Sequence, residues 1–230
     1  MLYLFLLVLF LVAYDLLAHI SYASFHFARG EVNARMADVI LINKVNSLQN
    51  LDQAKKQADR IRSLLKKDTP VLFGNSIVSP EARDVSTGEL LDGAKVDDLV
   101  RGKRVLVIDD GPTLTHGGMP FGAGFVLAKQ MGAKEIVDPH PYAKGSLVDV
   151  LKKFQHLERV LPAMGYGEAQ IRDLEKTVQS VDCDCIITGT PINLENVIDM
   201  KKPSVRARYC LQLDVEHMDT MKHALMPFTK

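Results

Sequence analysis

One stretch decides the fold of this chain: residues 105–118 read VLVIDDGPTLTHGG. Its first four residues are apolar, which is typical of a strand buried on both faces. Two aspartates and a loop of Gly, Pro, Thr and His follow, and residues 122–130 then have the pattern of a helix. A strand, a glycine-rich polar loop and a helix form the unit in which open α/β folds bind phosphates and nucleotides. We therefore expect the chemistry of this protein at that loop.

Strands and helices alternate from residue 102 onward. We expect strands at residues 104–108, 135–137, 159–161, 185–188 and 205–209, and helices at 122–130, 146–154, 168–180 and 194–200. This alternation predicts a parallel sheet covered by helices on both faces, as in a Rossmann-like α/β domain. The turns after the strands would then lie along one edge of the sheet.

The part before residue 80 predicts a smaller α/β segment. Residues 36–44 and 69–73 have the composition of short buried strands, and residues 48–67 carry apolar side chains at helical spacing. Residues 80–101 are mostly polar and are interpreted as a connector, and residues 214–230 as a short amphipathic tail.

The bulk composition excludes some classes of function. There are 28 basic and 28 acidic residues, and zero net charge argues against a nucleic-acid binder, which needs a basic surplus. Cys183, Cys185 and Cys210 have neither a zinc spacing nor the pattern of a disulfide framework. We expect reduced, buried thiols and a cytoplasmic location.

The amino end is unusually apolar, because residues 2–13 contain no polar side chain apart from one tyrosine hydroxyl. This run is too short to span a bilayer, and no Lys or Arg precedes Arg29 as in a signal peptide. A buried strand reaching Asp15, a membrane anchor or uncleaved signal, and a displaced gene start all stay open. Membrane association is expected only if residues 1–18 act as an anchor.

A candidate base-binding motif, Asn43-Lys44-Val45-Asn46, follows the first of these strands. In P-loop GTPases, N-K-x-D at this place binds guanine, and its Asp accepts two hydrogen bonds from the base. Asn46 replaces that Asp, and an amide cannot supply the two acceptors of a carboxylate. Asn43, Lys44 and Asn46 are thus candidate nucleotide ligands without strong guanine preference, and a plain strand-to-helix turn is the alternative.

Asp109 and Asp110 end the central strand, where Walker-B-like carboxylates hold Mg²⁺ directly or through water. The alternative is that one of them caps the following turn. The loop then offers two hydroxyls and an imidazole as hydrogen-bond donors, and two glycines that let backbone N–H groups approach phosphate: Thr113, Thr115, His116, Gly117 and Gly118. We assign catalytic roles to Asp109, Asp110 and His116.

Further candidates follow other strands. His140 and Lys144, in a turn that also contains Asp138, are expected to contact an anionic substrate, although Lys144 has the alternative of a solvated surface lysine. Arg206 and Arg208 alternate on the last strand and so share one face. They would bind a phosphorylated substrate or, alternatively, form salt bridges.

Two motifs are missing from the sequence. There is no G-x-x-x-x-G-K-[ST], and therefore no Walker A loop. Leu127 occupies the third glycine position of a dinucleotide fingerprint that would begin at Gly122, which argues against a Rossmann dehydrogenase.

These motifs resemble the cyclic 2,3-diphosphoglycerate synthetase family, whose wider membership is described as predicted GTPases. The most specific segment is DGPTLTHGGM at residues 110–119. Other segments carry the resemblance from residue 30 to residue 209: GEVNARMAD (30–38), NKV (43–45), EIVDPHPYAKG (135–145), VLPAMGY (160–166), GTPINL (189–194) and KPSVRARY (202–209).

Members of that family are longer, and this chain resembles their second half, whereas the P-loop lies in the first. The resemblance implies ATP-driven closure of an intramolecular phosphoanhydride, or a related phosphoryl transfer that uses ATP or GTP with Mg²⁺. It implies a small phosphorylated substrate and, as partner, a separate P-loop-bearing chain or a second copy. The alternative is a non-catalytic remnant or a phospho-ligand-binding or partner-binding module.

The combined expectation is a Rossmann-like α/β domain at residues 102–213, preceded by the terminal part of a P-loop-like α/β domain at residues 1–79. The connector at residues 80–101 lies between them, and the tail covers residues 214–230.

Overall fold

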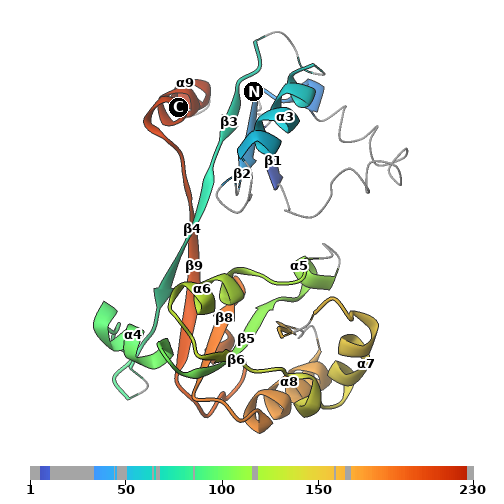
Figure 1. Cartoon of the computed structure of the whole chain (residues 1–230), viewed down its shortest axis with the longest axis vertical. Coiled ribbons are helices and arrows are strands. Elements are labelled where there is room, and N and C mark those ends of the chain that lie inside the picture. Colours follow the sequence, from blue (N-terminus) through green and yellow to red (C-terminus); the bar gives the residue numbers. More distant parts are fainter. Residues whose placement is uncertain are drawn as a thin grey trace. The chain divides into compact units, whose positions relative to one another are not determined.

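The computed structural model describes residues 6–10, 34–43, 45, 51–63, 65, 68–84, 86–115, 119–157, 159–163 and 167–226 (Figure 1). The chain divides into two compact units. The first comprises Met1–Ile77 and Cys210–Lys230, and the second comprises Val78–Tyr209.

The first unit contains a parallel three-stranded sheet in the order β1-β2-β3. Its strands are β1 (Leu6–Phe10), β2 (Val39–Asn43) and β3 (Val71–Phe73), and its helices are α3 (Leu51–Arg62) and α9 (Val215–Leu225). Ile40 and Ile42 of β2 pack with Ala58 of α3, whereas Leu41 packs with Met221 of α9. Successive side chains of β2 therefore enter opposite cores, which explains its uninterrupted apolar run.

The second unit is built on a six-stranded sheet in the order β4-β9-β8-β5-β6, with β7 also paired to β5; the first residues of β4 and the last of β9 are assigned to the first unit. The strands are β4 (Asn75–Glu81), β5 (Arg104–Asp110), β6 (Glu135–Ile136), β7 (Leu161–Ala163), β8 (Cys185–Gly189) and β9 (Ser204–Gln212). The central strand β5 pairs in parallel with β6, β7 and β8, and β8 pairs in parallel with β9. The carboxyl ends of these strands therefore lie at one edge of the sheet.

Helices cover both faces of β5. They are α4 (Gly93–Val100), α5 (Gly111–Thr115), α6 (Ala123–Gln130), α7 (Ser146–Lys153) and α8 (Glu168–Ser180). Val107 packs in a core that contains Leu127 of α6, whereas Ile108 packs in a second core that contains Leu174 of α8. The predicted α/β class, with a mostly parallel sheet, is confirmed.

Several expected boundaries differ from the structure. Residues 194–200 form only a single 3-10 turn, η3 (Leu194–Asn196), rather than a helix. Leu194, Ile198 and Met200 are all buried, and the two-residue step between the last two does not suit one helical face. The strand expected at residues 159–161 is β7, two residues further on, and the polar loop after β5 begins with the short helix α5.

The segment interpreted as a connector contains the end of β4 and all of α4. The Asp92 side chain accepts a hydrogen bond from the Lys95 backbone N–H at 2.9 Å and so caps α4. Val96 and Val100, four residues apart, are buried beneath it. A capping Asp with two valines at this spacing is the sequence signal for this helix.

Cys183 and Cys185 are free and buried, as expected, and burial raises the pKa of the Cys185 thiol to about 12. Cys210 is exposed, which corrects the expectation of a third core thiol. It lies in the second half of β9 (Ser204–Gln212), where Tyr209 and Leu211 are also exposed.

At the amino end, Leu6–Phe10 forms a strand paired with β2. Within the described segments, no helix combines the length and apolar character that crossing a membrane requires.

Candidate functional site

The two aspartates that end β5 lie in different surroundings. Asp109 is fully buried, and its carboxylate accepts backbone N–H groups from Gly122 at 2.8 Å, Gly124 at 2.7 Å and Phe125 at 3.3 Å. These donors are the first N–H groups of α6, which have no partner within the helix. Burial raises the pKa of Asp109 to about 6, although the three hydrogen bonds act in the opposite direction. Asp109 thus caps α6 and is mostly ionised at neutral pH.

Three glycines leave room for this buried carboxylate. A Cβ on Gly189, at the end of β8, would lie 2.0 Å from Oδ1 of Asp109 and 2.3 Å from the Gly124 nitrogen. A Cβ on Gly122 or Gly124 would lie within 3 Å of Asp109 side-chain atoms. We call Asp109, Gly122, Gly124 and Gly189 the Asp109 cradle. It joins β5, β8 and the start of α6 through contacts that only glycine permits.

Asp110 makes local hydrogen bonds instead. Its Oδ2 accepts from the Thr113 backbone N–H at 3.1 Å and from the Thr113 hydroxyl at 2.6 Å, so it caps the short helix α5. The Thr115 hydroxyl donates to the Gly111 carbonyl oxygen at 2.8 Å. Both carboxylates therefore act as helix caps, whereas the sequence had suggested capping, as the alternative to Mg²⁺ binding, for only one of them. Asp110 is partly exposed whereas Asp109 is buried, so the second carboxylate oxygen of Asp110 is better placed to meet a ligand than either oxygen of Asp109.

The predicted metal and phosphate roles of this loop stay predictions. Among the described residues, no group of three or more His, Cys, Asp or Glu side chains is placed to hold a metal ion. His116, Gly117 and Gly118 lie outside the described residues. Any Mg²⁺ here would therefore need oxygen ligands from water and nucleotide phosphates in addition to Asp110, which is the usual coordination of Mg²⁺.

The turn after β6 contains an ordered Asp–His pair. Asp138 Oδ1 accepts from the His140 backbone N–H at 2.9 Å and lies 2.7 Å from His140 Nδ1. In the neutral ring this contact places the proton on Nδ1, so Nε2 has a lone pair available for a ligand or a proton. Lys144, on the same turn, is exposed, and its backbone N–H donates to the Thr177 hydroxyl at 3.0 Å.

The two arginines of β9 have different partners. Arg208 forms two hydrogen bonds with Glu81 of β4, at 3.0 and 2.8 Å, and this pair lowers the pKa of the Glu81 carboxyl. It thus has the salt bridge that was the alternative to phosphate binding. Arg206 donates to the Pro191 carbonyl oxygen, in the loop after β8, and its Nε is buried with no hydrogen-bond partner in the described structure. Arg206 is therefore the arginine with a donor still to be satisfied.

The predicted site residues fall into both units. Asn43 ends β2 in the first unit, while Lys44 and Asn46 lie outside the described residues. The remaining described candidates belong to the second unit: Asp109, Asp110, Thr113, Thr115, His140, Lys144, Arg206 and Arg208. Asp110, His140 and Arg206 follow or lie beside the carboxyl ends of β5, β6 and β8, as parallel pairing requires.

Gly122, Gly124 and Gly189 were not predicted as site residues. The signal for the first two was the Gly-Ala-Gly run at the start of a helix, separated by the loop of residues 111–121 from a strand that ends in Asp. Gly189 gives no local signal of this kind, because its partner is 80 positions earlier in the chain.

No protein-family model matches this chain. It is 45% identical over 183 residues, 80% of its length, to arginine synthetase ArcE of Thermococcus kodakarensis. The match covers 37% of that relative, so the chain spans a little over a third of the length of the curated protein it matches. The similarity agrees with the synthetase, or ligase-type, character that the resemblance implied. It does not support the cyclic 2,3-diphosphoglycerate synthetase family specifically, nor a GTPase.

Proposed function

We propose that this chain forms part of an ATP-dependent synthetase and that the carboxyl-end loops of its second unit hold a small substrate through its carboxylate or phosphate group. The observation that carries this proposal is the 45% identity to a synthetase over 80% of the chain. ATP is proposed as the nucleotide because the relative is a synthetase, and Asn46, which stands where GTPases have an Asp, lacks the carboxylate that would give a strong preference for guanine.

The side chains at this edge suit three separate tasks. The paired Asp138 orients His140 so that Nε2 can accept a proton from an attacking group. Arg206 is partly exposed and would offer the accessible part of its guanidinium to an oxyanion of the substrate. Asp110 would bind Mg²⁺, directly or through water, and Mg²⁺ would neutralise the charge of the transferring phosphoryl group.

Asp109 does not take part in this proposal as a metal ligand. Both of its oxygens accept backbone N–H groups, and moving either one toward a cation would leave buried donors unsatisfied. Its task is to fix the start of α6 beside the loop.

The substrate is the finer part of the proposal. The relative's name gives arginine as its product, and we propose the same product class here rather than cyclic 2,3-diphosphoglycerate. The test is the thermal unfolding of the chain with arginine, 2,3-diphosphoglycerate or lysine, each with Mg²⁺. A ligand at about one hundredfold its Kd should raise Tm by about 5 °C.

We expect the shift with arginine, a loss of it in Asp138→Ala, and its retention in Asp98→Ala, an exposed aspartate of α4. A shift with 2,3-diphosphoglycerate but not with arginine would replace the proposed substrate by the phosphorylated acid. No shift with either ligand would overturn the proposal.

A second candidate function is a binding module without turnover of its own, favoured by the lack of a Walker A sequence in these 230 residues. Release of phosphate from ATP or GTP by the chain alone separates the two. The module predicts a rate equal to the buffer blank, whereas turnover that disappears in Asp110→Ala would show that the chain is a catalyst by itself.

A further inference from the structure

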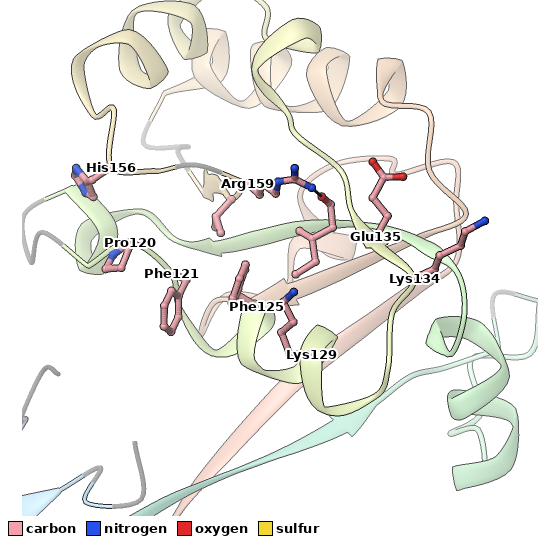
Figure 2. Close-up of a pocket in the computed structure, with 10 residues that line it drawn as sticks. Pro120, Phe121, Phe125, Lys129, Lys134, Glu135, His156 and Arg159 are labelled. Atoms are coloured by element: carbon pink, nitrogen blue, oxygen red, sulfur yellow. Dashed lines mark hydrogen bonds between the residues drawn. The ribbon is translucent and has the colours of Figure 1, made fainter. Parts of the chain in front are cut away.

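A pocket of about 350 Å³ lies beside α6 and β6 in the second unit (Figure 2). Its walls come from the start and end of α6, from β6 and from the segment before β7. The lining residues are Pro120, Phe121, Phe125, Lys129, Lys134, Glu135, Ile136, His156, Arg159 and Val160. None of them is among the candidate residues of the carboxyl-end loops.

One wall of the pocket is aromatic. The rings of Phe121 and Phe125 stack with centroids 4.8 Å apart and an interplanar angle of 22°. Phe121 is 37% exposed, and Figure 2 shows its ring next to that of Phe125. A second flat ring can therefore stack on this pair, a geometry that aromatic groups favour in proteins.

The pocket also has a surplus of positive charge. Lys129, Lys134 and Arg159 line it against one acidic residue, Glu135, which is paired with Arg104 at 2.9 Å. In the part of the chain that the structure describes, neither lysine forms an ion pair. The Lys129 ammonium lies 5.7 Å from the Phe125 ring centroid, so a cation stands next to the aromatic wall.

The cation on the opposite wall is held in place. Arg159 donates to the Ile136 carbonyl oxygen at 3.2 Å, and among the described residues it forms no ion pair, so the rest of its guanidinium can meet a ligand. His156 Nε2 lies 3.0 Å from the Leu114 carbonyl oxygen and is likewise fixed. Anchored donors lose little conformational freedom on binding, which favours affinity.

We propose that this pocket binds a small planar anion, that is, one aromatic ring system carrying a phosphate or carboxylate group. The ring would stack on Phe121, and the anionic group would lie between Lys129 and Arg159. The volume is at the lower end of the range of about 300–1,000 Å³ for ligand pockets, which suits a mononucleotide or a smaller aromatic acid. This inference does not depend on the proposed synthetase function.

The test measures binding of four probes to the chain by calorimetry at low salt: AMP, benzoate, inorganic phosphate and adenosine. We expect AMP or benzoate to bind. The tighter of the two shows whether the anionic group of the ligand is a phosphate or a carboxylate. We expect inorganic phosphate and adenosine each to bind at least about tenfold more weakly than the better of the two, because each supplies only half of the contacts.

Two variants and a control sharpen the result. Phe121→Leu keeps an apolar side chain but removes the flat ring, and Lys129→Gln removes one cation. Each should weaken the better probe about tenfold, while Lys152→Gln, an exposed lysine of α7 outside the pocket, should leave its binding unchanged. Phe121 and Lys129 are both exposed, so the unfolding temperature should stay close to that of the wild type.

Inorganic phosphate binding as tightly as AMP and benzoate would overturn the proposal, because the site would then be a cluster of surface cations. Unchanged affinity in Phe121→Leu, or no binding of either aromatic anion at millimolar concentration, would overturn it as well.

Discussion

Asp109 and Asp110 are neighbours in the sequence and have the same side chain, yet they belong to different kinds of structure. Asp109 enters a buried cradle formed by two other segments, the start of α6 and the end of β8. Asp110 instead caps a partly exposed helix and bonds to a residue three positions away. The comparison teaches that a pair of carboxylates after a strand need not be a pair in function. One of them positions the backbone, and the other is the group that a ligand can reach.

The largest expected effect is a break of the cradle by Gly189→Ala. The added Cβ would meet Asp109 and the Gly124 backbone at about 2 Å, and the backbone of α6 cannot move away without loss of its cap. We expect the free energy of unfolding to fall by about 4 kcal/mol or more, as for the severe core substitutions. Urea denaturation measures it. Gly93→Ala, where a Cβ meets nothing within 4 Å, is the control, and a similar loss there would contradict this account.

The next effect compares the two carboxylates directly. Asp109→Asn would turn an amide NH₂ toward backbone N–H donors and should destabilise the fold by about 3 kcal/mol. Asp110→Asn should change stability by less than about 0.5 kcal/mol, since Asn caps a helix about as well as Asp. Equal losses in the two variants, measured by denaturation at pH 7, would remove the distinction between the buried cradle and the open turn.

The pH dependence of stability should reveal the same distinction. Burial raises the pKa of Asp109 from its ordinary value of 3.8 to about 6 in the folded protein. Between these values the folded state binds more protons than the unfolded state, so the free energy of unfolding falls as pH rises from 4 to 6 and beyond. The fall is up to about 3 kcal/mol for this group.

That slope should be absent from Asp109→Asn, and the difference between variant and wild type isolates it from the other carboxyls. Glu81, Asp97 and Asp173 have lowered pKa values, and they stabilise the fold increasingly with rising pH, mainly below the window of Asp109. Parallel curves for wild type and variant between pH 4 and 7 would show that Asp109 titrates normally.

The smallest expected effect concerns the cap that Asp110 forms with Thr113. Thr113→Val removes the hydroxyl that donates to Asp110 at 2.6 Å but keeps the backbone N–H bond. We expect a loss of about 1 kcal/mol or less, because the contact is partly exposed. If Asp110 binds Mg²⁺, the variant should also change the affinity for Mg²⁺-nucleotide in a binding assay, which the Asp98→Ala control should not.

The central sheet could be predicted from the sequence because its signal is local. Four consecutive apolar residues before Asp109 indicate a strand buried on both faces, and the helices at 123–130, 146–153 and 168–180 have apolar residues at regular spacing. The prediction of a helix at 194–200 was wrong, because only a single 3-10 turn forms there and the buried side chains do not share one helical face. Helix α4 was missed, although Asp92 is a typical capping residue, because the surrounding stretch is mostly polar and was interpreted as a connector.

The site could be predicted only in part, for a different physical reason. The sequence shows which side chains follow strands, but their partners come from elsewhere in the chain. Arg208 meets Glu81, 127 positions away, and Asp109 meets residues 13 to 16 positions later as well as Gly189. Local pattern carries no information about such pairings. The Asp138–His140 pair is the contrary case. Its two residues are only two positions apart in one turn, so the local chain brings them together.

The Asp109 cradle also has a consequence for how the chain folds. The hydrogen bonds from Asp109 to the start of α6 link residues 13 to 16 positions apart, so a β5–α6 unit can form early. Gly189 joins only when β8 docks beside β5, with Val105 opposite Cys185. Strand pairing between residues so far apart in the sequence forms slowly. Until then one side of the carboxylate stays open to water. Closure of the cradle thus marks the arrival of β8 in the sheet, and refolding experiments can follow it through the protonation state of a single side chain.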